Sequence, residues 1–232
     1  MEKTIDFDTN PPVATTEYDD RARRAIPGYE AMHTMALSFL KFHLPETANL
    51  LIVGAGTGME LVKFSNNPQW QLLGVDPSTN MLAIAQQKIT QNDLSNRIKL
   101  FQGYTHELPE TPLYDGATCI LVMHFLPDDG SKLALLQSIA QRLKSSAPLI
   151  LVDICGEKGS REFEKTTAII KLFWEEMGMQ PEQINEGMKT IDKGVYPIAE
   201  SRTIELLQQA GFGDLVKFYT GLWGGGWVAA KN

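Results

Sequence analysis

The feature that most constrains this chain is a short glycine-rich loop between an apolar run and a helical pattern. The segment LLIVGAGTGMEL places Gly54, Gly56 and Gly58 in a G-x-G-x-G spacing directly after four apolar residues. A short apolar run that ends in glycines is typical of a buried parallel strand. Glycine permits positive φ angles and lets a ligand approach the backbone closely. The segment therefore predicts a strand–loop–helix unit that presents backbone N–H groups to a ligand.

Further apolar runs of strand length alternate with helical patterns along the rest of the chain. This alternation is typical of βαβ units, in which right-handed crossovers join parallel strands. Two closing runs separated by glycines predict a terminal hairpin. We therefore predict an α/β, Rossmann-like fold: a seven-stranded, mostly parallel sheet with an antiparallel last strand, helices on both faces and a helical cap. The strands after the first are expected at 70–76, 98–103, 115–123, 148–155, 215–221 and 225–231.

The patterned region also defines the domain organisation. Residues 1–16 are polar, include a Pro-Pro pair and are expected to be a flexible tail. Residues 17–232 are expected to form a single domain, with helices at 19–44 before the first strand. The interval 155–198 is too long for a connecting loop and has helical periodicity. We expect it to be a helical insertion that forms a cap together with the N-terminal helices.

An acidic residue ends the second expected strand. Asp76 closes the segment WQLLGVD, twenty positions after Gly56. A carboxylate there can accept hydrogen bonds from both hydroxyl groups of a ribose. A role as helix cap is the alternative, although Ser78 is the better-placed cap. A nicotinamide oxidoreductase is disfavoured, because the dinucleotide spacing G-x-G-x-x-G would need glycine where Met59 stands.

Together these motifs resemble the class I S-adenosylmethionine-dependent methyltransferases over about residues 50–230. VGAGTG is similar to the family's cofactor loop, GVDPSTNML to its acidic motif, LYDGATCILVMHFLP to its fourth motif and PLILVD to its fifth strand. The resemblance implies a methyltransferase with S-adenosylmethionine as cofactor and S-adenosylhomocysteine as product. It also implies that Asp76 binds the ribose and that backbone near Ile120 or Leu121 meets the amino-acid end. The other loop and motif residues expected at the cofactor are Gly54, Ala55, Gly56, Gly58 and Pro77.

The sequence departs from this family after the third expected strand. The family often carries an acid there that accepts a hydrogen bond from the adenine N6 group, whereas this chain has Gly103-Tyr104-Thr105. We expect Tyr104 to stack on the adenine ring and Thr105 to form a hydrogen bond with it. His106 is expected either near the adenine or in solvent.

Three segments are similar to a narrower group, the carboxy-S-adenosylmethionine synthases, which serve tRNA wobble-uridine modification. They are AIPGYEAM, HFLPDD and AGFGDLVKFYTGLWGGGWVAAK. The resemblance implies that Tyr29 contacts the cofactor, with packing between helices as the alternative. That group pairs the extra carboxylate with a cap arginine, but the matching stretch EGMKTIDKG offers only Lys189 and Lys193. A lysine makes a point contact instead of a bidentate one, so we expect a shared architecture and a different reaction.

Methyl transfer to oxygen or nitrogen can require a base as well as an aligned acceptor. His124, just past the fourth expected strand, is the candidate base because imidazole titrates near neutrality; a packing or capping histidine is the alternative. Asp153 is expected either to take part in the active site or to have a structural role at the end of its strand. Trp223 and Trp227 are expected to pack on the sheet or to form a homodimer contact. The residues expected around a small, partly apolar substrate are His33, His124, Trp174 and Lys189, with Glu175 as a further cap candidate.

Composition limits the partners. Asp and Glu total 28 against 21 Lys and Arg, and the net charge of −7 disfavours nucleic acid, whose non-specific binding is largely electrostatic. The two cysteines have no metal-binding or disulfide spacing. The chain begins without the apolar stretch of a signal peptide, and no apolar run reaches the roughly 18 residues of a membrane span, so we expect a cytoplasmic protein. A small-molecule methyltransferase is the main hypothesis; a carboxy-S-adenosylmethionine synthase-like enzyme and a non-catalytic cofactor-binding module are the alternatives.

Overall fold

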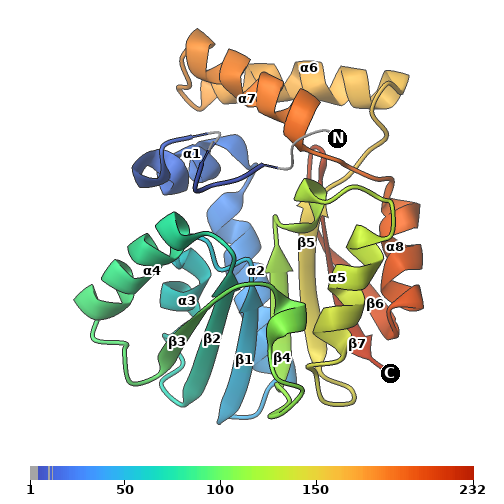
Figure 1. Ribbon diagram of the computed structural model, residues 1–232. Helices are drawn as coiled ribbons and strands as arrows, with labels where there is room; N and C mark the ends of the chain where they lie inside the picture. Colours follow the sequence, from blue (N-terminus) through green and yellow to red (C-terminus); the bar gives the residue numbers. More distant parts are fainter. Residues whose placement is uncertain (1–4, 10, 12) are drawn as a thin grey trace.

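The computed structural model describes residues 5–9, 11 and 13–232, and a seven-stranded sheet lies at the centre of these residues (Figure 1). The strand order is β3-β2-β1-β4-β5-β7-β6. Strands β1 to β5 run parallel, and β7 is antiparallel to both of its neighbours. The predicted fold class is confirmed. The strands are β1 (Ala48–Val53), β2 (Trp70–Asp76), β3 (Ile98–Gln102), β4 (Gly116–Ile120), β5 (Pro148–Ile154), β6 (Phe212–Gly221) and β7 (Gly224–Lys231).

Helices cover both faces of the sheet and bury its two apolar sides. Successive strand residues point to opposite faces, so in β1 Leu50 and Ile52 join one core while Leu51 and Val53 join the other. The first core lies under α2, α3 and α4, and the second lies under α5 and α8. These helices are α2 (Tyr29–His43), α3 (Met59–Phe64), α4 (Thr79–Gln91), α5 (Ser131–Ala140) and α8 (Glu200–Gln209).

Two further helices lie across the carboxyl ends of the parallel strands, next to α1 (Tyr18–Ala25) (Figure 1). They are α6 (Arg161–Glu176) and α7 (Pro181–Gly194), from the interval where a cap is predicted. Their inward residues, among them Phe163 and Trp174, form a third apolar cluster with Trp223 from the turn between β6 and β7. The indole N–H of Trp174 donates to the backbone oxygen of Ala25 at 2.9 Å, which ties α6 to α1.

Two strands differ by three residues from one of their predicted bounds, and the others by at most one residue. β4 ends at Ile120, three residues early, because Leu121 takes a left-handed conformation with φ of 59° and a 3₁₀ turn follows at Met123–Phe125. The apolar run that suggested a longer strand packs inside this turn. β6 begins at Phe212, three residues earlier than predicted. Its pairing with β7 shifts register just after Gly213, where the sequence has the composition of a turn.

Part of the predicted tail contacts the body of the protein. The carboxylate of Asp8 accepts the hydroxyl of Ser78 at 2.6 Å and the first backbone N–H groups of α4 at 2.9 Å. Phe7 packs edge-on against Tyr18 and Phe125. The described residues of the segment therefore cross the N-terminus of α4, and their mobility stays a prediction.

Residues 1–4, 10 and 12 of the predicted tail lie outside the described residues. Within the described ranges, no helix combines the length and the apolar character needed to cross a membrane. The same residues contain no cluster of acidic, histidine and cysteine side chains suited to a metal ion.

Candidate functional site

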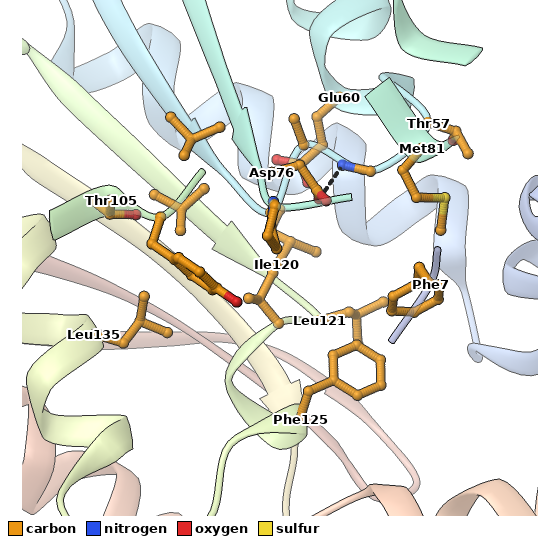
Figure 2. A pocket seen from close by; sticks show the side chains of 18 of the residues that line it. Phe7, Thr57, Glu60, Asp76, Met81, Thr105, Ile120, Leu121, Phe125 and Leu135 are labelled. Atoms are coloured by element: carbon orange, nitrogen blue, oxygen red, sulfur yellow. Dashed lines mark hydrogen bonds between the residues drawn. The ribbon is translucent and has the colours of Figure 1, made fainter. Parts of the chain in front are cut away.

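A cavity of about 490 Å³ lies at the carboxyl edge of the sheet, where β1, β2 and β4 end (Figure 2). The glycine loop after β1, helix α1 and the turn after β3 complete its walls. Figure 2 shows Glu60 and Asp76 on one side of this first cavity, with Leu121 and Phe125 on the other. The volume is within the range of about 300–1,000 Å³ that small-molecule sites usually have.

The glycine loop turns sharply between β1 and α3. The N–H groups of Gly54 and Ala55 both donate to the backbone oxygen of Val75, at 2.8 and 3.0 Å. Gly54 and Gly56 have φ angles of 69° and 50° and line the first cavity. Gly58, with φ of 81°, does not line it; its α-carbon faces α4, where a Cβ would lie 3.0 Å from the Cβ of Ala85. The first two glycines shape the ligand side of the loop, and the third permits close packing of two helices.

We expect Gly54→Ala to abolish S-adenosylhomocysteine binding and to destabilise the protein by about 3 kcal/mol. A Cβ at this position would lie 2.2 Å from a methyl carbon of Val122, in addition to the cost of the positive φ angle. Gly159→Ala is the matched control, because Gly159 has φ of 83° but no atom within 4 Å of the added Cβ. Urea unfolding and calorimetry measure the two effects. Equal losses of stability in both variants would contradict the packing argument.

Asp76 links the end of β2 to the glycine loop. Its Oδ2 accepts the N–H of Gly56 and its Oδ1 the N–H of Ser78, both at 2.9 Å. Burial raises the pKa of Asp76, and these two hydrogen bonds act in the opposite direction. A carboxylate can accept about four hydrogen bonds, so Asp76 retains capacity for two more donors from a ligand in the first cavity.

Glu60, in the first turn of α3, is a buried carboxyl group on the wall of the same cavity. Its side chain reaches β4, where the hydroxyl of Thr118 donates to Oε2 at 2.6 Å. Glu60 is only 7% exposed, and burial raises its pKa to about 8 although the Thr118 bond lowers it. A buried carboxylate is costly unless it is paired. Glu60 is therefore suited to a cationic donor from a ligand.

A third carboxylate at the cavity already has strong partners. Asp19 of α1 accepts hydrogen bonds from the hydroxyl of Thr57 and from the ammonium group of Lys88. Tyr18 and Tyr29 stand nearby, and burial raises the pKa of Tyr18 to about 12 and that of Tyr29 further. Both phenols thus stay neutral hydrogen-bonding groups at physiological pH.

The segment that departs from the family pattern borders the first cavity from the other side. Tyr104, Thr105 and His106 all line it, and the rings of Tyr104 and His106 are stacked at 5.6 Å. Thr105 is buried, whereas Tyr104 is 56% exposed. The region therefore offers aromatic surface and a hydroxyl in the place where an acidic side chain is common.

A second cavity of about 150 Å³ lies under the cap and adjoins the first. His124 and Trp174, both predicted from the sequence, line this second cavity. The ring Nδ1 of His124 lies 2.5 Å from Oδ1 of Asp153, at the end of β5. The five residues that line both cavities are Phe7, Tyr18, Ala22, Leu121 and Phe125.

The structure brings most of the sequence-predicted residues to one of the two cavities. The predicted cofactor residues at the first cavity are Tyr29, Gly54, Ala55, Gly56, Asp76, Pro77, Tyr104, Thr105, Ile120 and Leu121. His33, expected near the substrate, also lines the first cavity, and burial lowers its pKa. Lys189, Lys193 and Glu175 lie on exposed faces of the cap helices and line neither cavity, because the inward faces of α6 and α7 are apolar.

Sequence reasoning missed several residues at the first cavity: Phe7, Tyr18, Asp19 and Glu60. One signal for Glu60 was available, since an acid interrupts the apolar residues of a helix directly after the last loop glycine. Trp223 and Trp227 are 4% and 2% exposed, so both pack inside the chain. A homodimer stays a prediction.

Part of the chain matches a known protein family. Residues 50–146, which carry the glycine loop, Asp76 and β4, match the family described as a methyltransferase domain. Over these residues the chain carries a methyltransferase domain, and it resembles the class I S-adenosylmethionine-dependent methyltransferases. Its sheet order, with an antiparallel β7, is the fold of these enzymes.

Relatives of this chain differ in their named reactions. It is 30% identical over 137 residues to the demethylmenaquinone methyltransferase of Lactiplantibacillus plantarum, covering 58% of this chain and 56% of that enzyme. It thus spans little more than half the length of that relative. It is 24% identical over 203 residues to the carboxy-S-adenosyl-L-methionine synthase of Staphylococcus epidermidis, covering 86% of each chain. A solved S-adenosylmethionine-dependent methyltransferase from Methanosarcina mazei shares the fold, with a TM-score of 0.60, 16% identity and coverage of 83% and 96%.

The first cavity fits the cofactor that the family implies. S-adenosylmethionine carries a ribose diol, which matches the unused acceptor capacity of Asp76, and an α-ammonium group, which matches the buried carboxyl group of Glu60. The backbone at Gly54 and Gly56 has no Cβ, so a ligand can lie directly against it. The residues present are therefore chemically suited to hold the whole cofactor.

Proposed function

We propose that this methyltransferase transfers the methyl group of S-adenosylmethionine to a small-molecule acceptor and releases S-adenosylhomocysteine. The observation that carries the proposal is the pair of adjoining cavities. The first has carboxylates and a glycine loop suited to the cofactor, and the second is apolar and lies under the cap. Two ligands that react by direct transfer need neighbouring compartments shielded from water.

Each part of the first cavity has a role in this proposal. Asp76 binds the ribose hydroxyls, and the backbone from Gly54 to Gly56 lies along the methionine moiety. Glu60 binds the α-ammonium group, while Tyr104 and Thr105 contact the adenine. The bound cofactor supplies an already activated methyl group, so the protein's contribution is to align the acceptor with the S–CH₃ bond.

The size of the second cavity and the net charge of the chain favour a small acceptor. The volume of about 150 Å³ matches a group the size of one ring. The net charge of −7 also gives no general attraction for a nucleic-acid backbone. A small, partly apolar molecule is the acceptor class that these features support.

A carboxy-S-adenosylmethionine synthase activity is the second candidate, because relatives with that name align over most of the chain. Such a cofactor carries an extra carboxylate that needs a cation. Lys189 and Lys193, the cations of the matching cap stretch, are exposed and line neither cavity. This placement removes the two cap lysines as partners for that carboxylate.

Mass spectrometry of the ligand that co-purifies with native protein tests the proposal. We expect S-adenosylmethionine or S-adenosylhomocysteine, and calorimetry should detect binding of S-adenosylhomocysteine but not of NAD. Recovery of the carboxylated cofactor would favour the synthase reading. Absence of bound ligand together with absence of S-adenosylhomocysteine binding would overturn both enzyme activities.

A further inference from the structure

His124, which lines the second cavity, forms a buried pair with the carboxylate of Asp153. Oδ1 of Asp153 accepts the backbone N–H of His124 at 3.1 Å and lies 2.5 Å from its ring Nδ1. The side chains of His124 and Asp153 are 5% and 1% exposed. With the Nδ1 proton directed at the carboxylate, the neutral imidazole presents Nε2 as a proton acceptor. Within the described part of the chain, no hydrogen bond occupies Nε2.

One cationic side chain interacts with Asp153, and another lines the second cavity. Lys132, fully buried in α5, donates from Nζ to the backbone oxygen of Met123 at 2.8 Å. Burial lowers the pKa of Lys132, and the charge of Asp153 opposes this effect, so the two groups stabilise each other. Arg21 of α1 lines the second cavity and donates to the backbone oxygen of Gln183 at 3.1 Å.

The shape and lining of the second cavity indicate the size and class of its ligand. An engineered cavity of about 150 Å³ with apolar walls binds one benzene ring, and the second cavity has about the same volume. Aromatic and aliphatic side chains make up most of its walls, including Phe125, Ile154, Trp174 and Trp223. Arg21 adds a positive charge, which favours an oxygen that becomes negative.

The position of the second cavity beside the first allows direct transfer between ligands. Leu121 lines both cavities. Its φ angle of 59° is left-handed, so the chain leaves the extended path of β4 at this residue. Phe7 and Phe125 also belong to both linings. A ring in the second cavity would therefore contact side chains that also border the first cavity.

We infer that the second cavity binds a single-ring aromatic acceptor with a hydroxyl group, and that His124, oriented by Asp153, is the general base for its O-methylation. The inference rests on the proposed function. The acceptor O–H bond breaks and the proton moves to Nε2 of His124. The oxygen electron pair forms a bond to the methyl carbon, while the S–CH₃ bond breaks and its electron pair remains on sulfur as the neutral thioether. The imidazolium then returns its proton to water.

The variant His124→Asn tests the base with two probes at pH 8. 4-Methylphenol is neutral at this pH because phenols ionise near 10, whereas 4-nitrophenol is already ionised. We expect kcat for 4-methylphenol to fall by about 10²–10³-fold and kcat for 4-nitrophenol by less than about tenfold. The methyl ethers and S-adenosylhomocysteine are measured by mass spectrometry. Equal losses with both probes would overturn the base assignment.

A second variant tests the location independently of catalysis. Ala25 lines the second cavity but not the first, so Ala25→Leu should weaken 4-methylphenol binding by more than about tenfold and leave S-adenosylhomocysteine affinity unchanged. An unchanged phenol affinity would place the acceptor elsewhere. If the wild-type protein binds S-adenosylhomocysteine but forms no methyl ether from either phenol, this inference is wrong and the proposed function still stands. If it does not bind S-adenosylhomocysteine, the proposed function fails with it.

Discussion

Asp76→Ala is expected to weaken S-adenosylhomocysteine binding by at least about a hundredfold. The substitution removes the acceptor for both ribose hydroxyls, and hydrogen bonds to a charged acceptor contribute about 1.5–3 kcal/mol each. It also frees the N–H groups of Gly56 and Ser78, which Asp76 holds at 2.9 Å in the ligand-free arrangement. Calorimetry with purified variants gives the change in Kd.

Asp115→Ala is the matched control for this prediction. Asp115 also accepts two hydrogen bonds, from the N–H of Asn49 at 2.8 Å and from Lys144 at 2.6 Å, but it precedes β4 at the opposite edge of the sheet. Loss of the Asp115 carboxylate should lower the free energy of unfolding and leave the Kd for S-adenosylhomocysteine unchanged. A Kd for Asp76→Ala within about threefold of wild type would contradict the ribose assignment.

Glu60→Gln is expected to have opposite effects on stability and on cofactor binding. The folded pKa of about 8 lies above the ordinary value of 4.5. The stability that the bound proton provides is therefore fully present below pH 4.5 and is lost as the pH rises towards 8, at about 1.4 kcal/mol per unit. Glutamine needs no proton. The ligand-free variant should exceed wild type in free energy of unfolding by about 2–4 kcal/mol at pH 8.5 and by little at pH 5.

The same substitution should weaken binding of S-adenosylhomocysteine by at least about tenfold. In the wild type at pH 7, binding of the α-ammonium group requires Glu60 to ionise, so one proton should be released and affinity should rise between pH 6 and pH 8. Calorimetry in buffers with different ionisation enthalpies measures this proton. 5′-Methylthioadenosine lacks the amino-acid end, and its affinity should not change.

Glu110→Gln is the control, because Glu110 is an exposed loop residue that lines neither cavity. It should alter neither the pH dependence of stability nor the affinity. Equal weakening of S-adenosylhomocysteine and 5′-methylthioadenosine in Glu60→Gln would contradict the ammonium assignment. A variant that unfolds at the same urea concentration as wild type at both pH values would contradict the burial argument.

The sequence was sufficient to predict the sheet, because buried parallel strands and amphipathic helices leave periodic signals. The glycine loop and Asp76 were also accessible, since they follow directly from their strands. The end of β4 was not, because Leu121 is apolar like the strand before it and only tertiary packing shows its left-handed conformation.

The rest of the candidate site depends on contacts between distant segments. Glu60 meets Thr118 across 58 positions, and His124 meets Asp153 across 29. Neither pairing has a local pattern, so the sequence could name His124 and Asp153 separately but not as a pair. Lys189 seemed placed for an anionic ligand by its position in the cap, yet the rotation of α7 turns it outward. Helical periodicity fixes which residues share a face and leaves open which face is covered.

The wall shared by the two cavities has a thermodynamic consequence. Phe7, Tyr18 and Leu121 each line both cavities, so any adjustment that a ligand in one cavity makes to their packing changes the free energy of binding in the other. Such coupling is reciprocal: the factor by which cofactor alters acceptor affinity equals the factor by which acceptor alters cofactor affinity. Phe7 comes from the N-terminal segment that Asp8 links to α4 by hydrogen bonds, so removing that segment should weaken the coupling between the two ligands without unfolding the sheet.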